Sequence, residues 1–122
     1  MDDEEAIRHM AAALLKRMGI EAMVVSDGQQ ALLAYAAART AGRPFNLVIL
    51  DLTVPGGMGG RETIERLRQM DPAVRALVSS GYSSDPVLAR HRDHGFLGIV
   101  AKPYDLAELT AAINGALRPA AG

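Results

Sequence analysis

The sequence contains no cysteine and no tryptophan, and aromatic residues make up only 4% of its 122 positions. The absence of cysteine excludes disulfide bonds and thiolate metal sites. The scarcity of aromatic side chains means that the core must be built from aliphatic residues, in a chain that is 49% hydrophobic. No apolar run approaches the roughly 20 residues that a membrane-spanning helix requires.

An excess of charge is also missing. The formal net charge is −1, so no broad basic field indicates direct binding to nucleic acid. The chain opens with acidic residues, whereas a signal peptide opens with a basic segment. Its length is that of one ordinary domain. We therefore expect a cytoplasmic protein with no membrane attachment, with one domain over residues 1–118 and a short tail over residues 119–122.

Short apolar runs alternate along the chain with segments of helical periodicity. Helices are predicted over residues 4–18, 29–41, 61–70, 85–94 and 105–117, and strands over residues 22–25, 45–50, 76–78 and 98–101. Asp85 and Asp105 stand where helix N-caps are expected. Apolar strands that alternate with amphipathic helices indicate an α/β fold, in which helices cover both faces of a parallel sheet.

Polar side chains stand where predicted strands end or where a strand-to-helix loop is expected. These residues are Asp2, Asp3, Asp51, Ser79 and Lys102. Because ligands of parallel α/β sheets bind beyond the carboxyl ends of the strands, these side chains are expected to line one crevice. Ser80 remains an alternative to Ser79, because adjacent residues of a strand face opposite sides of the sheet.

The chemistry of such a crevice follows from its side chains. Three carboxylates at close range repel each other, so that either a pKa rises or a cation binds among them. Ligands that are all oxygen suit Mg²⁺. Lys102 can pair with a phosphoryl oxygen and Ser79 can donate its hydroxyl proton to another. A carboxylate such as that of Asp51 can act as a nucleophile and form an acyl phosphate.

Four pieces of the sequence carry a resemblance to a known family over nearly the whole chain. They are Asp2-Asp3-Glu4-Glu5, the apolar run that ends at Asp51 with Pro55 four residues on, Val78-Ser79, and Lys102-Pro103-Tyr104. In this order and at this spacing they resemble the response-regulator receiver domains of two-component signalling, in particular those of hybrid sensor histidine kinases. The resemblance implies a flavodoxin-like doubly wound parallel sheet.

The resemblance also implies a role for each site residue. Asp51 would be the phosphoacceptor, Lys102 would bind the phosphoryl group beside a cis bond to Pro103, and Ser79 would be the switch hydroxyl. The ligands of the Mg²⁺ cofactor would be Asp3 directly, Asp2 mainly through water, Asp51, and the backbone carbonyl of Thr53. The donor would be a phosphohistidine of a sensor histidine kinase or a phosphotransfer domain. Catalysis would be limited to the domain's own phosphorylation and slow autodephosphorylation.

The sequence departs from the family pattern in ways that change the expectations. The usual first strand, which lies inside the sheet, is missing, so that four strands are predicted from this chain. Its absence would leave strand edges exposed and predicts reduced stability or association, as a dimer or by strand exchange. Ile99, three residues before Lys102, replaces the aromatic residue that many members carry there. The helix over 105–117 and the strand before it form the family's usual partner surface.

Three other functions compete with the phosphoacceptor. A receiver that has lost efficient phosphorylation could serve as a docking or dimerisation module, an interpretation favoured by the missing strand. An aspartate-nucleophile phosphatase of the haloacid-dehalogenase type would need a second Asp two residues after Asp51, where the sequence has Thr53. A flavodoxin-like FMN binder would share the fold, but the loops lack aromatic residues for stacking on a flavin.

Overall fold

The computed structural model describes residues 1–81 and 85–118. Along the chain the elements are α1 (Glu5–Arg17), α2 (Gly28–Thr40), β1 (Val48–Asp51), α3 (Gly60–Met70), β2 (Ala76–Ser80), α4 (Pro86–Ala89), β3 (Gly98–Ala101) and α5 (Leu106–Leu117). The predicted tail over residues 119–122 lies outside the described residues. Within the described ranges no helix has the length and apolar character needed to cross a membrane.

The three strands form one parallel sheet in the order β1-β2-β3. Asp51 at the end of β1 pairs with Ser79 of β2, and Ser79 in turn pairs with Val100 of β3. All five residues of β2 are buried, as expected of a central strand that is covered on both faces. The predicted α/β fold with a parallel sheet is thus confirmed.

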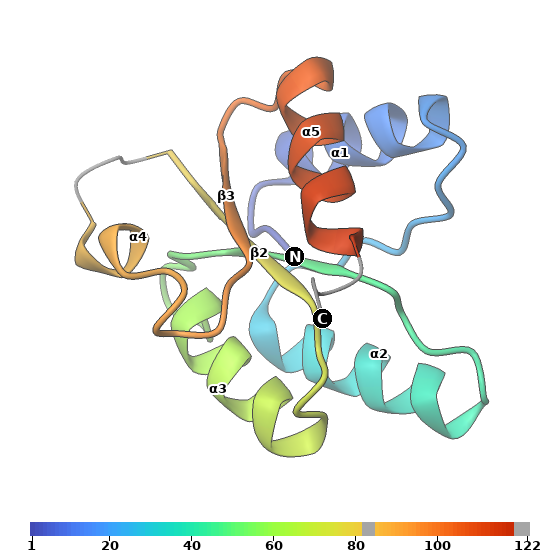
Figure 1. Cartoon of the computed structure of the whole chain (residues 1–122), viewed down its shortest axis with the longest axis vertical. Coiled ribbons are helices and arrows are strands. Elements are labelled where there is room, and N and C mark those ends of the chain that lie inside the picture. The colour runs from blue at the N-terminus through green and yellow to red at the C-terminus, as the bar shows by residue number, and fades with distance from the viewer. Residues whose placement is uncertain (82–84, 119–122) are drawn as a thin grey trace.

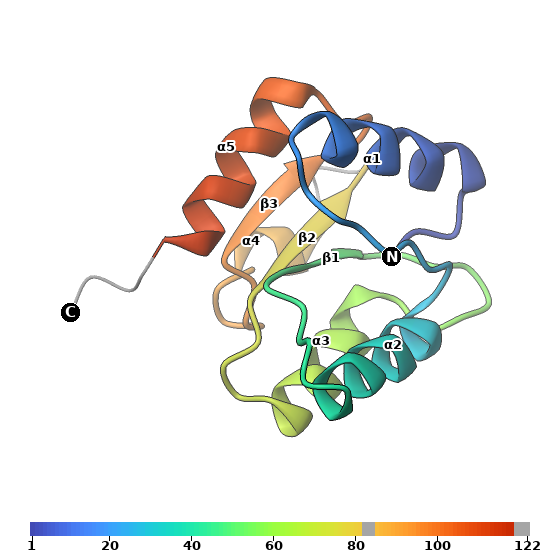
Figure 2. The same ribbon diagram turned by 90° about the vertical axis from the view of Figure 1, so that its right-hand side faces the viewer.

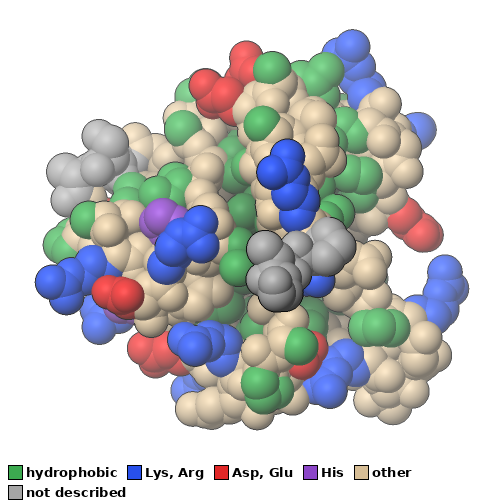
Figure 3. Space-filling model, in the orientation of Figure 1, with side chains coloured by type: hydrophobic (Ala, Val, Ile, Leu, Met, Phe, Trp, Pro, Cys, Tyr) green, Lys and Arg blue, Asp and Glu red, His purple; other side chains and the backbone are tan. Residues whose placement is uncertain are grey.

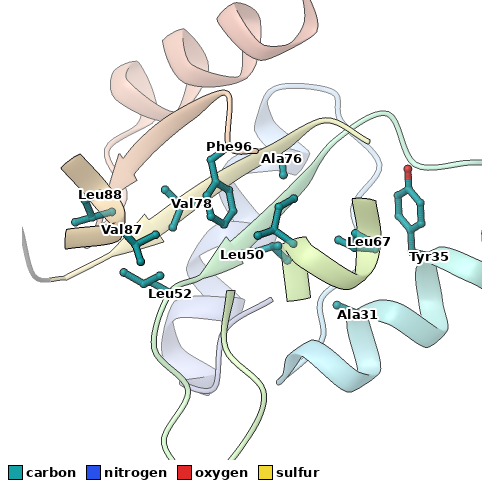
Figure 4. Packing of buried hydrophobic residues seen from close by; sticks show 11 residues of the cluster. Ala31, Tyr35, Leu50, Leu52, Leu67, Ala76, Val78, Val87, Leu88 and Phe96 are labelled. Atoms are coloured by element: carbon teal, nitrogen blue, oxygen red, sulfur yellow. The ribbon is translucent and has the colours of Figure 1, made fainter. Parts of the chain in front are cut away.

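Helices cover both faces of this sheet (Figures 1 and 2). Helices α2 and α3 pack on one face, and Figure 4 shows the aliphatic cluster between them and the strands. Its members include Ala31, Tyr35, Leu50, Ile64, Leu67, Val78 and Phe96. On the other face, Leu109 and Ile113 of α5 pack against Leu77 and Val100, with Leu14 of α1 at the margin. As predicted, the core is almost entirely aliphatic.

The prediction of a strand over residues 22–25 was wrong. This segment is irregular, and its Met23 and Val24 side chains are 61% and 44% exposed. Backbone groups of a strand need a neighbouring strand as hydrogen-bond partner. Within the described ranges, one backbone hydrogen bond joins this segment to the chain beside it, from the Asp2 amide to the Val25 carbonyl at 3.1 Å. The described residues therefore form three strands, where four were predicted.

Met1 and Asp2 occupy the position between β1 and this irregular segment. The Met1 ammonium donates to the Ile49 carbonyl at 2.8 Å, and the Asp51 amide donates to the Met1 carbonyl at 3.0 Å. Figure 2 shows the N-terminus lying beside β1. Two residues thus make the contacts of a parallel strand at the carboxyl end of β1, which fixes the acidic N-terminus next to Asp51.

The helix predicted over residues 85–94 is also shorter than expected. It begins as predicted, with the Asp85 carboxylate accepting a hydrogen bond from the Val87 amide at 2.9 Å, but α4 ends at Ala89. The backbone of Arg90 leaves the helical region, and turns follow. These turns, which include Gly95 at a φ of 100°, bring Phe96 into the core, where it is 1% exposed. Burial of this large side chain outweighs the local preference for helix.

Candidate acidic site

Four segments of the chain meet at the carboxyl end of the sheet. Asp51 ends β1, Ser79 lies near the end of β2, Lys102 follows β3, and Asp2 precedes α1. The Lys102 ammonium lies 3.0 Å from the Asp2 carboxylate and 3.2 Å from the Asp51 carboxylate. Asp2 and Asp51 are each only 3% exposed. The structure therefore brings together side chains that are up to 100 residues apart in sequence.

The Asp2 carboxylate is held on both of its oxygens. One oxygen accepts a hydrogen bond from the Lys102 ammonium, and the other accepts a hydrogen bond from the Glu4 amide at 2.9 Å. The Arg8 side chain donates to the Asp2 backbone carbonyl at 2.8 Å. These bonds fix Asp2 at the start of α1, although the sequence alone would allow an acidic, solvated helix start.

Electrostatic strain is concentrated on Asp51. Burial raises the pKa of its carboxyl, and the neighbouring Asp2 charge raises it further, to about 6 from an ordinary 3.8, against the opposing effect of Lys102. One oxygen of the Asp51 carboxylate is buried and has no hydrogen-bond partner among the residues that the structure describes. Burial of the Lys102 ammonium disfavours its charge, but the bonds to Asp2 and Asp51 outweigh this and raise the Lys102 pKa. The site has more negative charge than the lysine alone can balance.

The oxygen donors of the site suit a hard cation. Oxygens of Asp2, Asp3 and Asp51 all lie within 4.8 Å of one another, with Asp3 exposed to solvent and the other two buried. Mg²⁺ prefers carboxylate oxygens together with retained water molecules, which the exposed side of Asp3 can admit. The unpartnered Asp51 oxygen is a further acceptor. These residues fit Mg²⁺, and they are the single such group of His, Cys, Asp and Glu side chains in the described ranges.

The loop after β1 is packed tightly against the strand end. A Cβ atom on Gly60 would lie 2.8 Å from the Asp51 backbone carbonyl oxygen, and one on Gly59 would lie 2.5 Å from that of Leu52. Both glycines are therefore required for the start of α3 to approach the site. Thr53, whose backbone carbonyl was predicted to bind Mg²⁺, is exposed in the same loop.

Ser79 lies in the site with a partner that sequence reasoning missed. The register places its side chain on the same face of the sheet as that of Asp51, and Ser79 is fully buried. The Tyr104 hydroxyl donates a hydrogen bond to the Ser79 hydroxyl oxygen at 2.8 Å. The peptide bond between Lys102 and Pro103 is cis, as predicted. The sequence held one indication of this contact: Tyr104 comes two residues after Lys102 and so lies close to a strand end.

Comparisons with known proteins agree with this geometry. The sequence profile described as "Response regulator receiver domain" matches residues 1–114. The chain belongs to the receiver domain family. Among curated relatives of this receiver domain, Sporulation initiation phosphotransferase F of Bacillus subtilis is 29% identical over 114 residues, which cover 93% of the chain and 87% of the relative. Sensory transduction protein RegX3 of Mycobacterium tuberculosis is 34% identical over 119 residues, or 97% of the chain and 49% of RegX3.

Solved structures give the same family of folds. Chemotaxis response regulator CheY4 of Vibrio cholerae matches with a TM-score of 0.80 and 25% identity, over 95% of the chain and 93% of CheY4. A chain from the CheX-CheY-BeF3-Mg complex of Borrelia burgdorferi matches with a TM-score of 0.86 and 18% identity, over 97% of the chain and 86% of its own length. The receiver domain thus has the flavodoxin-like α/β fold that its sequence predicted.

The general function of this chain follows from its membership of the family. Receiver domains of two-component systems accept phosphoryl groups from histidine kinases or phosphotransfer proteins, and they bind Mg²⁺ in an acidic pocket. The acidic cluster of this chain is consistent with both properties. The chain spans about half the length of RegX3.

Proposed function

We propose that Asp51 is the residue of this receiver domain that accepts the phosphoryl group, from a phosphohistidine of a sensor histidine kinase or a phosphotransfer domain. The observation that carries the proposal is the buried Asp51 oxygen without a hydrogen-bond partner among the described residues, in a site that also holds the Asp2 and Asp3 carboxylates and the Lys102 ammonium. In the transfer, a carboxylate oxygen of Asp51 forms a bond to phosphorus while the bond from phosphorus to the histidine nitrogen breaks, and the imidazole leaves.

The other side chains of the site would manage charge during this transfer. Lys102 stands 3.2 Å from the Asp51 carboxylate, within reach of an oxygen of a phosphoryl group attached there. Asp3 would ligate Mg²⁺ directly, Asp2 mainly through water, and Asp51 and the Thr53 carbonyl would complete its protein ligands. When bound, Mg²⁺ supplies positive charge that balances the negative charge of the transferring group. Ser79 would donate its hydroxyl proton to a phosphoryl oxygen.

The output of the domain would be a protein contact. Helix α5 and strand β3 form the face that we propose as this contact surface, because they adjoin Lys102 and Ser79. Ile99 in β3 is 41% exposed, and Leu97 directly before β3 is 39% exposed. Direct binding to nucleic acid is not proposed: on the face shown in Figure 3, basic side chains are interspersed with acidic and apolar ones. We place the domain in the cytoplasm, where its phosphohistidine donors would act, and regard residues 1–118 as the domain.

Association through the open side of the sheet is a second part of the proposal. Among the described residues β1 is an edge strand, with only Met1 bonded beyond it, and helix α1 contains no buried residue. A second copy of the chain could pair along this edge, by dimerisation or by strand exchange. Light scattering over a range of concentrations tests this: we expect a dimer that Met23→Lys weakens, and a monomer at all concentrations would refute it.

Two of the three rival functions make different predictions. A docking module without phosphorylation is favoured by the same open edge of β1, and it predicts a folded chain that never gains a phosphoryl group. An aspartate-nucleophile phosphatase predicts steady hydrolysis of a small phosphate ester, but Thr53 stands where its general acid would be needed. The acidic, metal-binding cluster beside Lys102 favours the phosphoacceptor over both.

The decisive experiment is intact-mass spectrometry after incubation with Mg²⁺ and acetyl phosphate. We expect a gain of about 80 Da, the mass of one phosphoryl group bound as an acyl phosphate, in the wild type. Asp51→Asn should abolish the gain, and Asp93→Asn, at an exposed Asp in the turns that follow α4, should leave it intact. A folded wild type without the adduct, or an adduct that persists in Asp51→Asn, would refute the assignment.

A further inference from the structure

The hydroxyl of Ser79 is held by a second hydroxyl, that of Tyr104. The donor–acceptor distance is 2.8 Å, and the Ser79 side chain is fully buried near the carboxyl end of the central strand β2. Tyr104 belongs to the segment between β3 and α5, directly before Asp105, whose carboxylate caps α5 by accepting the Glu108 amide at 3.1 Å. The tyrosine is partly buried against the core beneath α5. Its ring is therefore fixed by packing, and its hydroxyl is aimed at one partner.

The direction of this bond determines what the serine can do next. A serine hydroxyl has one proton to donate and two lone pairs that accept. Because Tyr104 donates, the Ser79 oxygen is an acceptor in this bond, and its own proton stays available for another acceptor. On the same face of the sheet, and paired with Ser79 in register, lies Asp51 with its unpartnered carboxylate oxygen. A donor with a free proton thus adjoins the position where an acceptor-rich phosphoryl group would be attached.

The bond also restricts how the serine rotates. A free hydroxyl side chain exchanges among three staggered rotamers, and a bond from a packed tyrosine selects the one that keeps the oxygen toward Tyr104. In addition, a hydroxyl that accepts one hydrogen bond becomes a stronger donor in the next, because neighbouring bonds in a chain polarise each other. Both effects act on Ser79 through its oxygen, without any contact between Tyr104 and the phosphoryl group.

We infer that Tyr104 is a positioning residue for the phosphorylated state: its hydroxyl orients Ser79 so that the serine proton points to the group on Asp51. This inference rests on the proposed function, because it needs a phosphoryl group at Asp51. Tyr104 would act on the phosphoryl group only through Ser79. Removal of the tyrosine hydroxyl should therefore matter only while the serine hydroxyl is present.

Beryllium fluoride with Mg²⁺ can stand in for the phosphoryl group, because BeF₃⁻ binds a carboxylate oxygen and presents fluorine atoms as acceptors. We would titrate it by calorimetry into the wild type, Tyr104→Phe, Ser79→Ala and the double variant. Loss of one hydrogen bond is expected to weaken binding by about three- to tenfold in Tyr104→Phe. Ser79→Ala should weaken it at least as much, and the double variant should be no weaker than Ser79→Ala.

The outcomes separate this inference from the proposed function. Equal or tighter binding in Tyr104→Phe, or an equal loss in the presence and absence of Ser79, would overturn the role of Tyr104. A merely structural role would lower the melting temperature of the free variant and would also persist without Ser79. A folded wild type that neither binds BeF₃⁻ nor gains a phosphoryl group would instead overturn the phosphoacceptor. Tyr104→Met, which also lacks the hydroxyl, supplies the same comparison if Tyr104→Phe does not fold.

Discussion

Asp51→Asn should make the metal-free domain more stable at neutral pH while it abolishes phosphorylation. The substitution removes one of two buried carboxylates. It keeps a side-chain oxygen that can accept a hydrogen bond from the Lys102 ammonium, which in the wild type lies 3.2 Å from the Asp51 carboxylate. Asn also has nearly the volume of Asp, so that the packing around the site is preserved. The change therefore isolates the electrostatic cost of an ionised Asp51.

The raised pKa of Asp51 fixes the sign and the size of the effect. The pKa of Asp51 is 3.8 without the folded environment and about 6 within it. Between these pH values the native state binds the Asp51 proton more tightly than the unfolded state does. Stability therefore falls as pH rises through this window, and above pH 6 the ionised group costs roughly 3 kcal/mol. This cost is already net of the attraction between Asp51 and Lys102, and Asn escapes it, so we expect a gain of about 1–3 kcal/mol at pH 7.5.

Urea unfolding in EDTA at several pH values measures this gain. The free energy of unfolding of Asp51→Asn should exceed that of the wild type at pH 7.5, and the difference should shrink toward zero near pH 4. Added Mg²⁺ should stabilise the wild type more than the variant, because it binds the same carboxylates. Asp93→Asn, at an exposed position, serves as the control. No gain at pH 7.5, or a gain independent of pH, would refute the electrostatic account of the site.

Three further substitutions have predicted effects, two beside Asp51 and one in α5. Lys102→Met should lower the free energy of unfolding at pH 7.5 by about 3 kcal/mol, because it leaves two buried carboxylates without their cation; in an Asp51→Asn background the loss should be smaller, and equal losses in both backgrounds would contradict this coupling. Gly60→Ala should destabilise by about 1–3 kcal/mol and slow phosphorylation, since its Cβ would meet the Asp51 carbonyl oxygen at 2.8 Å. Gly115→Ala, in α5 with open space around it, should instead stabilise by about 0.5–1 kcal/mol in the same urea assay.

The sequence allowed the site to be predicted better than some of the elements around it. Asp51, Ser79 and Lys102 follow or end apolar strands, and the geometry of parallel sheets places all such ends at one edge. No tertiary information beyond the order of elements is needed for that step. The same reasoning brought Asp2 and Asp3 to this edge, because a loop before the first helix must start there.

The errors arose where distant contacts decide local structure. Residues 22–25 have the composition of a strand, but a strand forms only when a neighbour satisfies its backbone groups, and here only Asp2 does so. The end of α4 at Ala89 depends on the burial of Phe96, which no local pattern reports. Tyr104 was visible as a residue, but its bond to Ser79 depends on the path of the chain after the cis peptide bond.

The ion pair between Lys102 and Asp2 closes a loop of nearly the whole chain, because its partners are 100 residues apart. Closing a loop of this size costs entropy, and folds that depend on long-range contacts form more slowly than folds built from local ones. A chain with one segment out of place would have no complete acidic site, however well the rest had folded. Competence for phosphoryl transfer therefore reports that folding is finished, and a kinase that modifies Asp51 would act only on fully assembled molecules.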